Sequence, residues 1–233
     1  PADRKVYDKL DSDMVAEIDG DYLVTELPMH LAQRKREIAQ GQIQVDGYEE
    51  YMNEKTGEWK KRALISFVPS GRSPKLDEAK KIMADYPNEK FILFTPSKKF
   101  AKKLHADLPN SVLYDGDTSS AERDEAKRRF IDKEDSGARI LIGTEAIAEG
   151  IDGLQKSCRM MIRFMVSFTP YKNTQVIGRI ARRGGSESVM IWDILTRKTL
   201  DDGTLSESMA RALRNNKAKA MAIKREEEQE KNK

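Results

Sequence analysis

The fold of this chain is set by two stretches: TEAIAEGIDGLQ at residues 144–155 and TPYKNTQVIGRIARRGG at residues 169–185. The first begins directly after a short apolar run and contains a glycine and an aspartate, Gly150 and Asp152. This pattern predicts a buried strand that ends at Thr144 and a turn beyond it. Ligands of open α/β sheets bind at the carboxyl ends of the strands, so we expect this turn to lie at a binding site.

The second stretch contains a Q-x-x-G-R-x-x-R spacing, formed by Gln175, Gly178, Arg179 and Arg182. In a helix these four positions share one face. Two guanidinium groups one turn apart, each planar and always charged, suit a polyphosphate better than lysines would. An alternative is that the same arginines, with Arg183 and two glycines, form only a solvated basic helix end and its cap. The strand end in the first stretch favours the polyphosphate interpretation.

TEAIAEGID and QVIGRIARRGG resemble the fifth and sixth motifs of superfamily-two helicases and translocases, in that order and at a natural separation. In that family both motifs belong to the second of two RecA-like domains. The four fixed residues of the second motif would arise by chance in roughly one chain in a thousand, at about 5% per residue. The resemblance implies a RecA-like α/β domain with a parallel sheet.

The chain beyond Pro74 supports this fold class, because strand-like and helix-like runs alternate with little interruption. We expect strands at residues 91–95, 112–114, 139–143, 160–166 and 189–194, and helices at residues 75–86, 97–108, 119–131 and 171–183. Short apolar strands between amphipathic helices predict a parallel sheet that is covered on both faces. The last segment, residues 201–233, is rich in lysine and glutamate and is expected to be helical, either as a solvated tail or as a brace between motor domains.

Residues 1–73 are predicted to form a separate helical connection with an inserted β-hairpin. Apolar residues recur every four positions from residue 4 to residue 19, which predicts a helix that Gly20 stops. A second helix is expected between Pro28 and Gly41, and residues 42–68 are expected to contain a hairpin that turns at residues 53–57. This region resembles the connection between the motor domains of Swi/Snf-type translocases, especially their annealing-helicase and phage-like relatives.

Composition limits the classes of function. Charged residues make up 35% of the 233 residues but the net charge is only +3, so a nucleic-acid surface must be a local patch. The single cysteine, Cys158, lies in an apolar run and is expected to be a buried thiol in a reducing compartment. His30 and His105 are isolated, so we expect no metal site. With no apolar run of about 18 residues, we expect no membrane partner and an intracellular location, cytoplasmic or nuclear according to the host.

Two further stretches resemble motifs of the same family. FILFTPSKK, at residues 91–99, resembles the fourth motif: a strand ends at Thr95, and Ser97 can cap a helix whose free N–H groups suit a phosphate. An ordinary capped turn is the alternative. YDGDTSSAERDEAKRRF, at residues 114–130, resembles the D-G-x-T-S block of Swi/Snf-type proteins, with Asp117 where the family commonly has serine. That carboxylate argues against a phosphate contact at this position. Ser119 and Glu122 are predicted to form a capping box, so part of the regularity of this block reflects helix initiation.

The sequence contains no G-x-x-x-x-G-K-[ST] loop, so it has no cradle for the β-phosphate of a nucleotide. By itself the chain is therefore not expected to be a complete P-loop ATPase. We expect the complementary N-terminal RecA-like lobe, with that loop and the carboxylates that bind magnesium, to lie upstream. An alternative of a different class is a non-catalytic nucleic-acid-binding or recombination module that uses the same basic helix.

The family resemblance implies roles for named residues in the second lobe of an ATP-dependent DNA helicase or translocase. Arg182 is expected to be the arginine finger on ATP bound with Mg²⁺, with Arg179 beside it. Gln175, Gly150 and Asp152 are expected to bind nucleotide, the aspartate accepting hydrogen bonds from the ribose. On the DNA side, phosphates of one strand are expected to be held independently of base sequence by Thr95, Lys98, Thr118 and Thr144.

Overall fold

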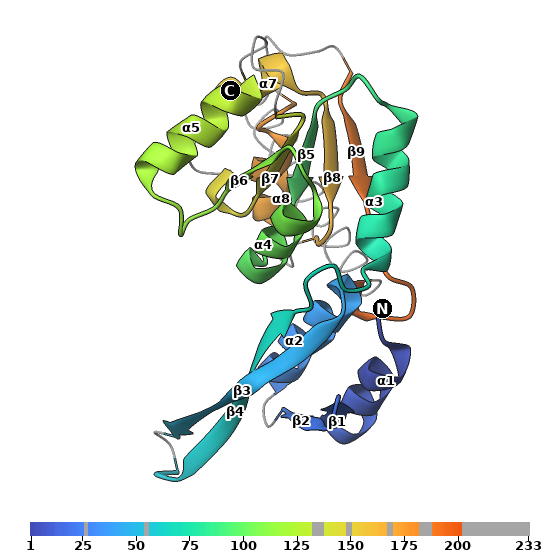
Figure 1. Cartoon of the computed structure of the whole chain (residues 1–233), viewed down its shortest axis with the longest axis vertical. Coiled ribbons are helices and arrows are strands. Elements are labelled where there is room, and N and C mark those ends of the chain that lie inside the picture. The colour runs from blue at the N-terminus through green and yellow to red at the C-terminus, as the bar shows by residue number, and fades with distance from the viewer. Residues whose placement is uncertain are drawn as a thin grey trace, which may run out of the picture.

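The computed structural model of this chain describes residues 1–25, 28–53, 56–131, 138–147, 151–166, 170–181 and 188–201. In these ranges an open parallel sheet with helices on both faces stands next to a smaller group of elements from the start of the chain (Figure 1). We call that smaller group, α1 to β4, the accessory module.

Five strands in the order β6-β7-β5-β8-β9 form the sheet, and every pairing in it is parallel. Their bounds are β5 (Phe91–Phe94), β6 (Ser111–Tyr114), β7 (Ile140–Gly143), β8 (Met160–Arg163) and β9 (Met190–Asp193). Helix α3 (Pro74–Asp85) precedes β5, and the helices between the strands are α4 (Lys98–Asp107), α5 (Ser120–Ile131), α7 (Leu154–Ser157) and α8 (Pro170–Ile177). The predicted α/β RecA-like class is confirmed, and its cause is the alternation of apolar strands with amphipathic helices.

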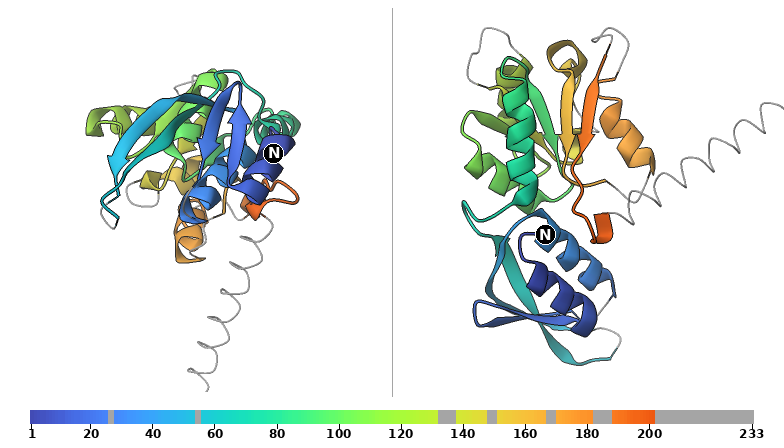
Figure 2. Two further views of the ribbon diagram at one scale, coloured as in Figure 1. Left: turned by 90° about the horizontal axis from the view of Figure 1, so that it is seen from below. Right: turned by 90° about the vertical axis from the view of Figure 1, so that its right-hand side faces the viewer.

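Alternate side chains of the strands feed two different layers of core. Phe91 and Leu93 of β5 pack with α3 and α4 on one face, whereas Ile92 and Phe94 pack with α5, α7 and α8 on the other. Figure 2 shows α3 and α8 on opposite sides of the sheet. Because both faces are covered, all four residues of β5 are buried, which explains why this strand is an unbroken apolar run.

The carboxyl ends of the central strands are aligned. The N–H of Thr95 donates to the carbonyl of Gly143 at 3.1 Å, and the N–H of Thr144 donates to that of Tyr114 at 3.2 Å. The N–H of Phe164 extends the same ladder to β5. The turns that follow β5, β6, β7 and β8 therefore start at one level, which we call the carboxyl edge.

The accessory module contains two helices and two antiparallel strand pairs. Its elements are α1 (Arg4–Asp13), β1 (Val15–Ile18), β2 (Asp21–Val24), α2 (Pro28–Gln40), β3 (Ile43–Met52) and β4 (Trp59–Phe67). The expected second helix and the expected hairpin are both present, and β3 and β4 extend well away from the sheet (Figure 1). A ring contact between Phe67 and Phe100, with centroids 5.1 Å apart, joins the module to α4.

The predicted helix over residues 4–19 is wrong in its second half. The helix ends at Asp13, because Met14 takes a left-handed conformation with φ of 59° and its N–H closes the last turn on Leu10. A hairpin comes next, in which β1 pairs antiparallel with β2 through a tight turn at Asp19 and Gly20, both with positive φ. An Asp-Gly pair is a signal for this kind of turn, and it outweighs the four-residue period.

Candidate functional site

The turn after β5 leads directly into helix α4. Thr95 is fully buried, and its Oγ1 accepts a hydrogen bond from the N–H of Ser97 at 3.3 Å. The side chain of Ser97 in turn accepts from the N–H of Phe100, so the predicted cap of this helix is confirmed. In this conformation the hydroxyl of Thr95 thus stabilises the turn by accepting a backbone hydrogen bond.

The turn after β6 is organised by a buried carboxylate. Asp115 is 0% exposed, and its Oδ1 accepts from the N–H groups of both Asp117 and Thr118 at 2.9 Å. The Thr118 hydroxyl donates back to the Asp115 carbonyl at 2.8 Å. Among the described residues the second carboxylate oxygen, Oδ2, has no hydrogen-bond partner. A rigid loop with one unused buried acceptor therefore stands beside the carboxyl edge.

The capping box expected at the start of α5 is also present. The N–H of Ser119 donates to the Glu122 carboxylate at 2.8 Å, and the N–H of Glu122 donates to the Ser119 hydroxyl at 3.2 Å. This bond from the Ser119 backbone is the main cause that lowers the pKa of Glu122.

Lys98 is exposed, but it has a carboxylate partner. Its ammonium donates to Oδ1 of Asp117, and Lys102 lies 3.8 Å from the other oxygen. This hydrogen bond is the main cause that raises the pKa of Lys98 and lowers the pKa of Asp117. Because both side chains are about half exposed, water and salt screen the pair, and a phosphate can replace the carboxylate at little cost.

The turn after β7 needs glycine at residue 143. A Cβ built there would lie 1.7 Å from Cδ1 of Ile147, whose side chain is fully buried. The chain folds back immediately, and the N–H of Ile147 donates to the carbonyl of Thr144 at 3.1 Å. Thr144 is 3% exposed and its N–H is already bonded to Tyr114, so its hydroxyl is the group left for a ligand.

The structure brings residues of the fifth-motif stretch and the sixth-motif stretch into contact. Nη1 of Arg179 lies 3.9 Å from Oδ1 of Asp152, with the arginine side chain 16% exposed and the aspartate 84% exposed. A second link joins Lys172 of α8 to Glu145, in the turn after β7, at 2.8 Å. Gln175 is exposed on α8. A guanidinium and an exposed carboxylate side by side have the chemistry to hold phosphate oxygens and ribose hydroxyls.

Helix α8 is shorter than predicted. It ends at Ile177, and the N–H groups of Arg179 and Ile180 reach back only three residues, to Val176 and Ile177. The expectation of a helix over residues 171–183 is therefore wrong for residues 178–181, although the N–H of Ala181 still donates to the carbonyl of Ile177. Gly178, a poor helix former, directly follows the helix end. Arg182 and Gly150, two of the predicted nucleotide-site residues, lie outside the described residues.

The expected DNA contacts all lie at the carboxyl edge or on the turns beside it. Thr95, Lys98, Thr118 and Thr144 come from the turns after the adjacent strands β5, β6 and β7. Their assignment to DNA stays a prediction. The sequence did not indicate that the end of α2 faces the same edge, where Arg36 and Gln40 line a pocket together with Ser97, Lys98 and others.

No group of three or more histidine, cysteine, aspartate or glutamate side chains that could hold a metal ion occurs among the described residues. Cys158 is a buried free thiol, and burial raises its pKa to about 12. Within the described ranges no helix is both long and apolar enough to cross a membrane.

Comparison with known proteins agrees with this architecture. Residues 74–184 match the family described as helicase conserved C-terminal domain. The crystal structure of the C-terminal part of the Fun30 ATPase domain is similar over 59% of this chain and 46% of that chain, with a TM-score of 0.52 and 22% sequence identity. At this identity the likeness concerns the fold alone. No curated protein matches the chain.

Proposed function

We propose that the chain is the second motor lobe of an ATP-dependent DNA helicase or translocase of the Swi/Snf-like kind. The match of residues 74–184 to the helicase conserved C-terminal domain supports this proposal. The observation that carries the proposal is the contact between Arg179 and Asp152, which joins the sixth motif to the fifth beside the carboxyl edge. A partner lobe with the phosphate loop closes on this side of the sheet. Alone, this lobe does not turn ATP over.

On the nucleotide side, Arg182 is the arginine finger. Its planar fork stabilises charge that develops on the γ-phosphoryl oxygens in the transition state. Magnesium bound with ATP would supply further positive charge at these oxygens. Arg179, whose guanidinium lies 3.9 Å from Asp152, stands beside the finger and stabilises the same developing charge. Gln175, Gly150 and Asp152 contact the nucleotide itself, with the carboxylate on the ribose.

On the DNA side, the turns after three adjacent strands hold the backbone of one strand. Lys98 releases Asp117 and pairs with a phosphate, and the Thr118 hydroxyl exchanges the Asp115 carbonyl for a phosphate oxygen. The hydroxyls of Thr144 and Thr95 donate to neighbouring phosphate oxygens. Such contacts carry no base specificity, which suits an enzyme that moves along DNA. As the two lobes close and open, this lobe binds the strand alternately tightly and weakly.

Replacement of Arg182 by lysine tests the proposal. Arg182→Lys keeps the charge but removes the planar fork, so steady-state ATPase of the protein with both lobes, at saturating DNA, should fall by about 10³ or more. DNA affinity should change little. Arg183→Lys is the matched control, and it should reduce the ATPase activity only slightly.

Equal activity of the two lysine variants would remove the role of Arg182. It would favour the alternative, in which the basic segment only binds nucleic acid, because a lysine neutralises a phosphate about as well as an arginine.

A further inference from the structure

A pocket of about 540 Å³ lies between α2 and the carboxyl edge of the sheet. Its walls come from α2, from the turn between β5 and α4, and from the residues after β8; they include Ala32, Arg36, Gln40, Pro96, Lys98 and Met165. The volume is within the range of roughly 300–1,000 Å³ that is typical of ligand sites. We propose that this pocket receives one unpaired nucleobase of the DNA strand held at the carboxyl edge. The inference rests on the proposed function, because it requires DNA at this edge.

Gln40 is the residue that points to a ligand. It is 0% exposed, it lines the pocket, and within the described part of the chain neither Oε1 nor Nε2 of its side chain has a hydrogen-bond partner. Buried amides are normally satisfied, so an unsatisfied donor and acceptor side by side need a partner of their own. In either orientation of the amide, the side chain presents one hydrogen-bond donor group and one acceptor group.

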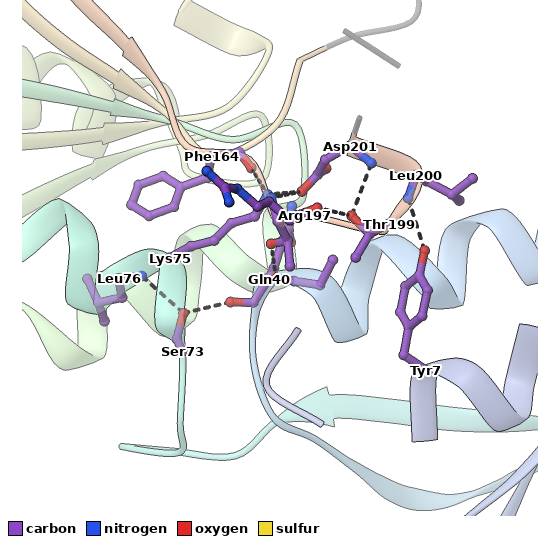
Figure 3. A network of polar contacts seen from close by, with 12 residues as sticks. Tyr7, Gln40, Ser73, Lys75, Leu76, Phe164, Arg197, Thr199, Leu200 and Asp201 are labelled. Atoms are coloured by element: carbon purple, nitrogen blue, oxygen red, sulfur yellow. Dashed lines mark hydrogen bonds and ion pairs between the residues drawn. The ribbon is translucent and has the colours of Figure 1, made fainter. Parts of the chain in front are cut away.

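The backbone of Gln40 is held firmly, which makes its side chain a positioned group. The residue ends α2, and its carbonyl accepts a hydrogen bond from the Ser73 hydroxyl at 2.6 Å (Figure 3). The two preceding residues, Ile38 and Ala39, are both part of the core. Gln40 therefore lines the pocket from a packed element and not from a loop.

The walls combine polar groups with apolar surface, which suits a base. Glu37 places a carboxylate in the lining, paired with Arg34 at 2.9 Å, and Arg36 adds a guanidinium. Lys99 donates to the Ile65 carbonyl, and Lys98, which bonds Asp117 here, is the group proposed to hold the phosphate of the same nucleotide. The side chains of Ala32, Pro96 and Met165 supply apolar surface on which a flat ring can pack.

The position of the pocket fits a strand whose backbone lies on the neighbouring turns. Ser97, in the turn after β5, and Lys98, the first residue of α4, both line the pocket. A nucleotide with its phosphate on that turn can direct its base into the pocket. Every base has a donor next to an acceptor on its Watson–Crick edge, so an amide binds each of them and the contact is tolerant of sequence. The strand must then be unpaired at this point.

Binding of the 233-residue chain to two single-stranded oligomers tests the inference. One is an oligothymidylate of about 12 nucleotides, a usual site size, and the other is an abasic oligomer with the same number of phosphates. The wild-type chain should bind the abasic oligomer at least about tenfold more weakly, since one stacked base contributes that much or more. Fluorescence anisotropy at constant salt measures both dissociation constants.

Gln40→Met removes the amide and keeps the length of the side chain. The ratio of the dissociation constant for the abasic oligomer to that for oligothymidylate should therefore fall by about fivefold. Gln44→Met is the matched control, because the Gln44 amide bonds Asp46 on the hairpin, and it should leave the ratio unchanged. Ala32→Leu fills the pocket from another part of α2 and should lower the ratio without altering Gln40, which provides an answer if Gln40→Met does not fold.

The outcomes distinguish failure of the pocket from failure of the DNA-binding lobe. If both oligomers bind and their ratio is the same in the wild type, Gln40→Met and Ala32→Leu, the base pocket is excluded while the DNA-binding lobe remains. If neither oligomer binds, the DNA part of the proposed function fails and the pocket inference fails with it.

Discussion

At the scale of single residues, burial separates the side chains that are part of the packed carboxyl edge from those that can change partners. Thr95 and Thr144 are both almost fully buried, but the Thr95 Oγ1 already accepts from Ser97. Lys98 is exposed, and it can exchange its present partner, the Asp117 carboxylate, for another anion. Of the four predicted DNA contacts, Lys98 and Thr144 are therefore the ones whose side chains need least rearrangement to reach a phosphate.

Thr144→Val removes one hydroxyl and keeps the shape of the side chain. In the protein with both lobes we expect DNA-stimulated turnover to fall about five- to tenfold, the effect of one lost hydrogen bond, with ATP affinity nearly unchanged. Titrating DNA in a steady-state ATPase assay measures this. Thr25→Val is the control, since Thr25 is also 3% exposed but its hydroxyl bonds Met14 in the accessory module.

A comparable loss of ATP affinity in Thr144→Val would place this residue on the nucleotide side of the lobe. A loss of DNA stimulation in Thr25→Val as large as that in Thr144→Val would show that the effect is one of folding.

At the scale of elements, two serines cap helices in the same way but differ in how much they contribute to stability. Ser119 caps α5 at the surface, within a capping box. Ser73 caps α3 and is buried; its hydroxyl accepts from the N–H of Leu76 and donates to the carbonyl that ends α2. The second serine therefore joins two elements, α2 and α3, which the sequence assigned to different domains.

Ser73→Ala should consequently destabilise the chain more than Ser119→Ala. We expect about 1 kcal/mol for the exposed cap and about 2–3 kcal/mol for the buried one, because the Gln40 carbonyl would also lose its partner. Urea unfolding of the two variants, followed by circular dichroism, gives the difference. Equal losses would mean that the bond to α2 adds nothing to the cap.

At the scale of the whole molecule, a buried ion pair fastens the end of the described chain to the sheet and to the accessory module. Nζ of Lys75 lies 2.7 Å from Asp201 and donates to the Phe164 carbonyl at 2.6 Å (Figure 3). The neighbouring residue, Leu200, donates its N–H to the Tyr7 hydroxyl at 3.0 Å. This junction sits where α1, α3 and the segment after β8 meet.

Burial lowers the pKa of Lys75, and Asp201 raises it by less. The folded chain therefore releases this proton at a lower pH than the unfolded chain, whose lysine has an ordinary pKa of 10.5. Between those two values the unfolded state binds more protons, so the contribution of this lysine to stability rises with pH in the alkaline range.

Asp201→Ala should cost about 3–5 kcal/mol, because it leaves a buried ammonium without its counter-charge. The double replacement Lys75→Met with Asp201→Leu should recover most of the loss. Glu78→Ala is the control: its partner Lys81 lies 3.1 Å away, both side chains are more than half exposed, and the change should stay within about 1 kcal/mol. Chemical denaturation measures all three; a small loss in Asp201→Ala would show that Lys75 is solvated.

Local pattern in the amino-acid sequence was enough to predict much of this protein. Alternating apolar strands and amphipathic helices indicated the parallel sheet, and the caps at Ser97 and Ser119 were predicted correctly. The fifth-motif and sixth-motif stretches indicated a helicase C-terminal domain from residue identity and spacing alone, and residues 74–184 match the model of that domain.

Competition between local signals was resolved only by tertiary packing, which also placed distant residues together. Residues 15–18 fit a helical period, but Ala16 and Ile18 bury their side chains by pairing β1 with β2. The end of α8 depended on how the chain turns at Gly178. The pocket joins Gln40 to the turn after β5, which is far away in the sequence, and no periodicity extends over such a distance. Periodicity reports which face of an element is buried, whereas packing decides what that face meets.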